Sequence, residues 1–594
     1  MHFVLDMPWG HSHKSVKYWK DRKIHVYSGP ILPSELRPYH TEDFSYGRWQ
    51  EDELNGMVLT PEKGETVFTP RDHQKDAAKS IFKAYSTGWS GFLEADKTGL
   101  GKTLSTLAGV TVIAKKAGFG VKNKGKLLIV CPKGVIPQWR QTLHNYPIST
   151  ALLRVVIINY QQLSKLLETP PNARVVKKAR TKNREIARNG KPLIDWDYII
   201  FDESQYLKNY PSSSVSMTAE RVAQLNKPYI KGKSPFVVFS TATPGSSPLN
   251  FSLMCGFMAP LISKKPSAKT VTPSKWGEFL ASENFSIKKG KSGYNWATIP
   301  WFGKGSDDPE ERAKYESDVA EAKLKQRKDA RRIGQALISD GAPFIMRSPK
   351  DIAGWPEQQF IPLPVELTSK QRPIYEEAWT RFRSFLRLPP AKQDSKSKLV
   401  ENLRYRQKSS LLKVDSMIDS IVDFVESGNQ VYISCQFIET IETYKEKLEA
   451  KKVRVVEISG RNADERTEMR LKFQKGHADV ALCTVTAGIS LHAGETLPDG
   501  TKASLNPRIT VIHDIRGNPE DAVQTLGRAH RDGTNSITYF PYLEKTVEEK
   551  VIASYTNKAA NMSSMIGRSS EESEFLEKLF KDAAMKTTPP NRMS

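Results

Sequence analysis

The hydrophobic positions of the chain fall into short unbroken runs rather than into an alternating pattern. Each run is followed by small or polar residues and then by a stretch typical of a helix. Runs this short and rich in Val and Ile are typical of strands buried on both faces of a parallel sheet, and their alternation with helices predicts an α/β fold. The runs are KLLIVCP (126–132), YIIFDES (198–204), FVVFSTATP (236–244), QVYISCQF (430–437), DVALCTVT (479–486) and ITVIHDI (509–515).

These runs form one group before about residue 250 and another after about residue 405, which predicts two α/β lobes. Between them lies a basic insertion whose second part is rich in helix-forming residues, so we expect it to carry one long helix. The expected division is an N-terminal accessory region (1–65), a first lobe (66–262), the insertion (263–342), a second lobe (343–555) and a C-terminal helix and tail (556–594).

A second basic segment, residues 173–191, interrupts the first lobe. Two interpretations stay open for it: a solvated, partly disordered loop, or a contact with nucleic acid.

The charge balance indicates the class of partner. The 594 residues include 89 Lys and Arg against 66 Asp and Glu, a formal charge of +23. Such an excess favours polyanions as partners, with nucleic acid ahead of a membrane surface.

No stretch has the pattern of a signal peptide or a membrane span, so we expect a soluble intracellular protein. The four cysteines are widely spaced and contain no CxxC pair, which argues against a zinc module and a disulfide framework.

The stretch ADKTGLGKT (95–103) resembles a phosphate-binding loop, with Asp96 where the first glycine usually stands. Apolar GFLEA before it and a helix-like stretch to residue 118 after it provide the strand and helix that such a loop joins. Gly99 and Gly101 would form the tight turn, Lys102 would balance phosphate charge, and Thr103 would offer a hydroxyl to Mg²⁺.

Two further strand ends carry candidate chemistry. Asp202 and Glu203 end an apolar run, where one carboxylate can hold Mg²⁺ and the other can orient or deprotonate water. The hydroxyls of STATP (240–244) can relay the presence of a γ-phosphate to neighbouring segments.

Near the other end of the chain, QTLGRAHRDG (524–533) places Arg528 and Arg531 three residues apart, on one face of a helix. Arginines brought to a γ-phosphate stabilise the charge of phosphoryl transfer.

Taken together, the motifs resemble the Swi/Snf family of superfamily 2 DNA-dependent ATPases in order and spacing over residues 66–555, with some likeness to the annealing-helicase branch. That family carries Asp at the position of Asp96, so the loop is not defective in this context. The resemblance implies two RecA-like lobes, parallel sheets flanked by helices, with a mainly helical insertion between them. It rests on RDHQ (71–74), ADKTGLGKT (95–103), LLIVCPKGVIPQW (127–139), IINYQQL (157–163), DESQYLKN (202–209), STATP (240–244), PFIMRSPKDI (343–352), TAGISLHA (486–493), QTLGRAHRDG (524–533) and TVEEKV (546–551).

The resemblance also implies roles for single residues around ATP and Mg²⁺. The catalytic residues would be Lys102, Glu203, which activates water, and the two fingers Arg528 and Arg531, which complete the site when the lobes close. Residues binding the nucleotide would be Gln74, which reads adenine, together with Gly99, Gly101, Lys102, Thr103, Asp202 and Gln524. The Mg²⁺ ligands would be Thr103 and Asp202.

Coupling of hydrolysis to movement would fall to Thr241, Thr243 and Gly488. Residues 132–139 and 484–488 look like the strips that grip the nucleic-acid backbone.

The sequence departs from the family pattern at several points, and we expect none of them to touch the catalytic groups. Gln205 stands where His is commoner, Ser204 is reminiscent of the annealing-helicase branch, residues 517–519 read Gly-Asn-Pro, and an extra loop covers 494–505. These departures leave the substrate branch open.

The leading interpretation is a Swi/Snf-type DNA translocase that hydrolyses ATP to move along or remodel duplex or forked DNA, without sequence preference. The basic insertion could then press on the second strand or on a fork. The alternatives are a strand-separating DNA or RNA helicase and, in another class, a catalytically inactive nucleic-acid-binding scaffold. The compartment would be the cytoplasm or nucleoid of a prokaryotic or virus-infected cell, or the nucleus of a eukaryote.

Overall fold

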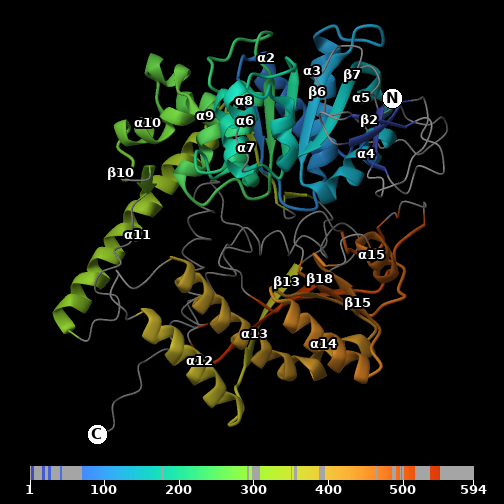
Figure 1. Ribbon diagram of the computed structural model, residues 1–594, viewed down its shortest axis with the longest axis vertical. Helices are drawn as coiled ribbons and strands as arrows, with labels where there is room; N and C mark the ends of the chain where they lie inside the picture. Colours follow the sequence, from blue (N-terminus) through green and yellow to red (C-terminus); the bar gives the residue numbers. More distant parts are fainter. Residues whose placement is uncertain are drawn as a thin grey trace. The chain divides into compact units, whose positions relative to one another are not determined.

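The computed structural model describes residues 2–5, 16–19, 24–28, 40–42, 70–175, 179–290, 293–296, 308–348, 351–352, 358–386, 395–461, 465–484, 490–495, 497, 501–514, 536–546 and 548. The chain forms two compact units (Figure 1). The first extends to Met346 except for Lys97–Leu100, which group with the second unit that starts at Arg347.

A six-stranded parallel sheet forms the centre of the first unit, in the order β12-β5-β9-β8-β6-β7. Its strands are β5 (Gly91–Glu94), β6 (Gly125–Cys131), β7 (Leu153–Asn159), β8 (Tyr198–Asp202), β9 (Phe236–Ser240) and β12 (Phe344–Ile345). The apolar runs expected at 126–132, 198–204 and 236–244 are strands here, which confirms the α/β prediction for this lobe.

Helices surround this sheet. The helices are α2 (Asp72–Ser86), α3 (Lys102–Lys116), α4 (Ile136–Asn145), α5 (Pro147–Leu152), α6 (Pro171–Val175), α7 (Ala179–Asn189), α8 (Ser214–Val222) and α9 (Cys255–Ile262). One core cluster joins α2, α3 and α4 to the sheet through Ile81, Leu107 and the fully buried Trp139. These three helices therefore fix the strand ends that carry the expected site.

The second unit repeats the plan with a parallel sheet in the order β13-β18-β17-β14-β16-β15. On its central strand, Val431 and Ile433 pack into one core cluster and Tyr432 into another, so both faces of the sheet are covered. The elements are β13 (Gln358–Val365), α12 (Gln371–Leu386), α13 (Ser395–Glu426), β14 (Gln430–Ser434), α14 (Ile438–Ala450), β15 (Val455–Ile458), α15 (Arg466–Gln474), β16 (Val480–Cys483), β17 (Arg508–Ile512) and β18 (Ser536–Leu543).

The insertion contains the expected long helix, α11 (Pro309–Leu337), which runs out from the first unit (Figure 1). It also contains α10 (Trp276–Ser282) and an antiparallel hairpin of β10 (Ile287–Gly290) and β11 (Gly293–Trp296), which the sequence did not predict.

The N-terminal region contributes a separate antiparallel sheet of β1 (His2–Leu5), β2 (Val16–Trp19), β3 (Ile24–Ser28) and β4 (His40–Glu42).

Two expectations about boundaries and loops are corrected. Residues 343–346 belong with the first unit because Phe344 and Ile345 pair with β5. The segment 173–191 is not a solvated loop, since α6 and α7 bury Ala173, Ile186 and Ala187. The many charged residues of this segment concealed its narrow apolar stripe in the sequence.

The remaining sequence-level expectations concern cysteines and membranes. All four cysteines are free and buried. Within the described ranges, no helix has both the length and the apolar character that crossing a membrane requires.

A buried histidine makes the second unit sensitive to pH. His513 lies 2.9 Å from the Ser410 carbonyl through Nε2, which must donate, so Nδ1 accepts from the Tyr444 hydroxyl at 2.8 Å. Burial lowers the pKa of His513 to about 4, and the nearby Lys413 acts in the same direction, whereas Asp514 opposes it.

Because the unfolded chain takes up this proton near pH 6.5 and the folded chain only near pH 4, stability falls as the pH drops through that window. We predict that His513→Gln removes up to roughly 3 kcal/mol of this pH dependence. The measurement is the free energy of urea unfolding at pH 7 and pH 4.5 for both proteins. Equal losses in wild type and variant would contradict the prediction.

Candidate nucleotide site

The phosphate loop connects the buried strand β5 to the N-terminus of α3. Gly99 and Gly101 have φ values of 98° and 82°, in the left-handed region that favours glycine. A Cβ at Gly101 would lie 2.1 Å from the side-chain nitrogen of Gln74. The loop therefore requires glycine at this position for both its backbone conformation and the approach of Gln74.

Gln74, the residue expected to read adenine, lies against the loop. Its Nε2 donates to the Gly101 carbonyl at 3.3 Å, and its Oε1 accepts from the Arg71 backbone N–H at 2.9 Å. The second contact belongs to the cap of α2 and fixes the orientation of the amide.

Lys102 and Thr103 start α3 directly after the loop. The Lys102 ammonium donates to the Asp96 carbonyl at 2.8 Å. Burial lowers the pKa of Lys102, while Glu203, Asp96, Glu94 and Asp202 act in the opposite direction. The surrounding carboxylates favour the cationic form of Lys102, which is the form needed to balance phosphate charge.

Asp202 ends β8 as a buried carboxylate. Its Oδ2 accepts from the Trp139 indole at 2.7 Å, and its Oδ1 accepts from the Glu203 backbone N–H at 3.0 Å. The Tyr160 hydroxyl donates to the Asp202 carbonyl at 2.6 Å. The pKa of Asp202 is raised to about 6, mainly by burial and also by Glu203, whereas Trp139 and Lys102 act to lower it.

Glu203 follows in the left-handed conformation, with φ 53°. Gln205 Nε2 donates to the Glu203 carboxylate at 3.0 Å, and Gln205 Oε1 accepts from the Thr241 hydroxyl at 2.6 Å. The Thr241 hydroxyl in turn accepts from the backbone N–H of Thr243 at 3.0 Å. A continuous chain of hydrogen bonds thus links the expected water-activating carboxylate to both expected coupling threonines.

This chain corrects the expectation that no departure from the family pattern touches a catalytic group. Gln205, one of those departures, contacts Glu203 directly. An amide has both a donor and an acceptor, so it can join a carboxylate to a hydroxyl.

Glu94 is a site residue that the sequence analysis missed. It is fully buried at the end of β5, its carboxylate accepts from the Ser105 hydroxyl, and its carbonyl accepts from the Thr241 backbone N–H at 3.0 Å. An acidic residue inside the apolar stretch GFLEA was the available signal.

Helix α4 connects the site to a strip expected to grip nucleic acid. Trp139 contacts Asp202, and the neighbouring Gln138 donates from Nε2 to the Thr103 hydroxyl at 3.3 Å. Two adjacent residues of the strip 132–139 therefore contact both expected Mg²⁺ ligands.

The donor set of this site suits Mg²⁺, which prefers oxygen ligands and keeps several waters. Asp202 would supply a carboxylate oxygen and Thr103 a hydroxyl. Gln524, Arg528, Arg531 and Gly488 lie outside the described residues.

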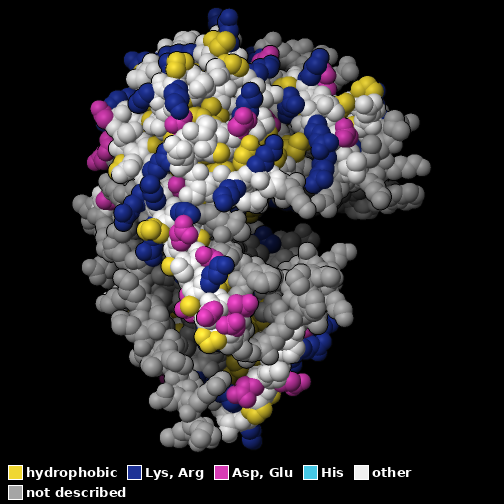
Figure 2. All heavy atoms as spheres, turned by 90° about the vertical axis from the view of Figure 1, so that its left-hand side faces the viewer, with side chains coloured by type: hydrophobic (Ala, Val, Ile, Leu, Met, Phe, Trp, Pro, Cys, Tyr) yellow, Lys and Arg dark blue, Asp and Glu magenta, His cyan; other side chains and the backbone are white. Residues whose placement is uncertain are grey.

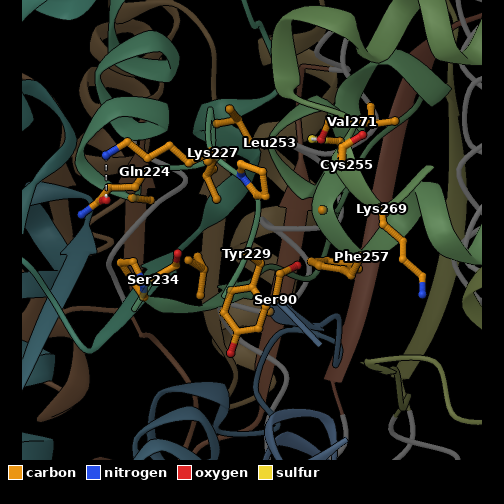
Figure 3. A pocket seen from close by; sticks show the side chains of 18 of the residues that line it. Ser90, Gln224, Lys227, Tyr229, Ser234, Leu253, Cys255, Phe257, Lys269 and Val271 are labelled. Carbon is orange, nitrogen blue, oxygen red and sulfur yellow. Dashed lines mark hydrogen bonds between the residues drawn. The ribbon is translucent and has the colours of Figure 1, made fainter. Parts of the chain in front are cut away.

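A cavity at the opposite edge of the sheet is not the nucleotide site. It lies at the amino ends of β5 and β9, beside Gly91 and Val237, and Tyr229, Cys255 and Phe257 also line it (Figure 3). Its volume of about 40 Å³ suits one or two water molecules rather than a nucleotide.

Comparison with known families identifies two domains in the chain. The SNF2-related domain matches residues 73–230, and the helicase conserved C-terminal domain matches residues 413–533. The chain belongs to the Swi/Snf family of superfamily 2. It is a nucleic-acid-dependent ATPase, an ATP-dependent translocase or helicase of the Swi/Snf type.

Relatives from several sources share low sequence identity with this Swi/Snf protein. A protein of Acanthamoeba polyphaga mimivirus named as an ATP-dependent RNA helicase, L364, is 23% identical over 80% of this chain and 79% of its own length. The chromatin structure-remodeling complex subunit snf21 of Schizosaccharomyces pombe is 20% identical over 81% of this chain but only 38% of its own. The Sulfolobus solfataricus SWI2/SNF2 ATPase core in complex with dsDNA is 17% identical over 88% of this chain and 98% of its own, with a TM-score of 0.28.

The bridge through Gln205 predicts a defect in turnover. Gln205→Ala removes the donor to Glu203 and the acceptor for Thr241, so we expect kcat for ATP hydrolysis to fall about tenfold or more through misplacement of Glu203. The KM for ATP should stay within about twofold, since neither the phosphate loop nor Gln74 is changed. Gln224→Ala, which removes an exposed amide bonded to Asp195, is the control. Equal kcat values for the two variants would refute the bridge.

The indole of Trp139 predicts a pH effect. Trp139→Phe removes a hydrogen bond to the ionised form of Asp202, so the pKa of this carboxyl should rise. ATP hydrolysis should then lose activity at pH 6 more than at pH 8, which moves the acid limb of the pH–rate profile to higher pH. Trp276→Phe is the matched control, because Trp276 is equally buried and donates to the Pro248 carbonyl instead. An unshifted acid limb in Trp139→Phe would contradict the prediction.

Proposed function

We propose that this Swi/Snf protein hydrolyses ATP to move along duplex or branched DNA. The observation that carries the proposal is the double contact of α4 with the expected Mg²⁺ ligands, Trp139 with Asp202 and Gln138 with Thr103. A nucleic acid bound along 132–139 would displace this helix slightly and thereby reposition both ligands. Hydrolysis would then depend on occupancy of the nucleic-acid strip.

The roles of the chain's residues follow from this arrangement. Lys102 would bind the β- and γ-phosphates, and Glu203 would orient or deprotonate the attacking water. Thr103 and Asp202 would hold Mg²⁺, which when bound supplies charge neutralisation on the phosphate oxygens. Gln74 would contact the base.

Release of hydrolysis products would be transmitted through the described hydrogen bonds. Gln205 would pass a change at Glu203 to Thr241 and from there to Thr243. Gln524, Arg528, Arg531 and Gly488 would act from the second lobe, the arginines by stabilising transition-state charge.

The preference for DNA rests on the family and on charge. A formal charge of +23 favours a polyanionic track, and contacts to phosphates would make binding largely independent of sequence. The compartment would be one that contains DNA: the cytoplasm or nucleoid of a prokaryotic or virus-infected cell, or the nucleus of a eukaryote.

A second candidate, strand separation on RNA, is favoured by the name of the mimiviral relative, an ATP-dependent RNA helicase. Unwinding assays on blunt and tailed duplexes of DNA and of RNA distinguish it. ATP-dependent separation of RNA strands without stimulation by duplex DNA would replace the translocase proposal.

The test of the proposed function is steady-state ATP hydrolysis with no nucleic acid, single-stranded DNA, blunt duplex DNA, forked DNA and RNA, at two salt concentrations. We predict stimulation by duplex or forked DNA that weakens at the higher salt. Lys102→Ala should lower the stimulated rate by about a hundredfold or more, because it removes a charge that acts on the transferred phosphoryl group.

Stimulation by RNA alone would favour the second candidate. Nucleic-acid binding without any hydrolysis would favour the inactive scaffold.

A further inference from the structure

The hairpin of the insertion exposes a pair of lysines. Its strands pair Ile287 with Trp296, Lys288 with Asn295 and Lys289 with Tyr294. Ile287 is buried, whereas Lys288 and Lys289 are exposed. The hairpin therefore has an apolar base and a basic outer part.

Helix α11 fixes the base of this hairpin through one buried carboxylate. Asp329 is only 2% exposed. Its Oδ2 accepts both from the Ser286 backbone N–H at 2.8 Å and from the Trp296 indole at 2.9 Å. Trp296 of β11 and Ser286, which directly precedes β10, are thus attached to the same point of α11.

Arg332 provides a second attachment one turn further along α11. Its guanidinium donates to the carbonyls of Asn284 at 3.1 Å and Glu283 at 2.7 Å. The same group lies 3.9 Å from the centre of the Phe285 ring. The segment that enters the hairpin is therefore held on both its polar and its aromatic side.

Helix α10 restricts the other side of the hairpin. A Cβ at Gly277 would lie 2.5 Å from the ring of Tyr294, so glycine permits this close packing. The two attachments to α11 and the contact with α10 hold the hairpin in one orientation. These contacts distinguish the hairpin from a loop that is merely solvated.

The part of α11 beside the hairpin is also basic. Six Lys and Arg residues fall between residues 323 and 332, and Lys323, Arg327, Lys328 and Arg331 are exposed. The pKa of Glu321 is lowered mainly by its partner Lys325 and also by Lys288, so the charge of the hairpin acts on this part of the helix. Lys and Arg side chains are widespread over the same face of the first unit (Figure 2).

We propose that hairpin β10–β11 and the adjoining basic part of α11 bind the phosphate backbone of duplex DNA at a surface outside the nucleotide site. A two-stranded ribbon is narrow enough to enter the major groove. Lysines offer point charges without base-specific geometry, so the contact suits a motor that moves along any sequence. This inference rests on the proposed function.

The test uses the full chain with Lys288→Ser and Lys289→Ser together. We expect the Kd for a blunt DNA duplex, measured by fluorescence anisotropy near 0.1 M salt, to rise about tenfold or more. If both lysines contact phosphates, the slope of log K against log salt should become shallower by about 1.8. The variant Lys288→Arg with Lys289→Arg keeps the charges and should retain wild-type binding.

Lys115→Ser with Lys116→Ser is the matched control, since these adjacent lysines are exposed at the end of α3, on another side of the unit (Figure 1). It removes the same charge, and we expect its Kd for the DNA duplex to differ from that of wild type by less than about threefold. Unfolding temperatures within a few degrees of wild type would show that all variants are folded.

Equal affinities of the hairpin and control variants for DNA would overturn the inference, as would a loss confined to an RNA duplex. In both cases the wild-type protein would still show DNA-stimulated hydrolysis. Failure of the proposed function itself would appear differently, as a wild-type protein whose hydrolysis does not respond to DNA.

Discussion

The buried carboxylate of Asp202 is the constraint on which the nucleotide site depends. A carboxylate taken out of water is costly unless hydrogen bonds compensate it. Burial raises its pKa to about 6, and the Trp139 indole, the Glu203 N–H and the charge of Lys102 offset part of this cost. The phosphate loop, β8 and α4 must therefore meet at one point.

The same requirement explains how the expected metal ligand, the expected nucleic-acid strip and the expected coupling threonines can share one sheet edge. Trp139 compensates Asp202 from a helix that also forms part of the expected nucleic-acid strip. On the other side, Gln205 joins Glu203 to Thr241 in the next strand end. A change in any one of these elements alters the environment of the carboxylates, which is a physical basis for coupling nucleic acid to hydrolysis.

The sequence predicted the parts of this structure that depend on local pattern. Short apolar runs identified strands in both sheets, and glycine spacing identified the phosphate loop. Contacts between residues far apart in the sequence could not be predicted. Trp139 and Asp202 are 63 positions apart, and nothing in the sequence around either residue indicates that they form a hydrogen bond. Gln205 was noticed only as a departure from a pattern, because its bridge from Glu203 depends on Thr241 lying within hydrogen-bond distance.

The hairpin β10–β11 escaped prediction for a different reason. Its strands are four residues each and include lysines and glycines. They take their stability from Asp329 and Arg332 of α11, which lie more than thirty residues later in the sequence. Tertiary contacts rather than intrinsic propensity determine such a strand. The segment 173–191 shows the same limit, since three buried apolar residues outweighed its charge.

Movement along duplex DNA is the central claim, and displacement of a third strand tests it most directly. A fluorescent oligonucleotide bound as a triplex on a long DNA duplex would be mixed with the protein and ATP. The account predicts ATP-dependent release of the third strand while the two duplex strands stay paired. Release of a duplex strand, or no release under conditions where DNA stimulates hydrolysis, would contradict it.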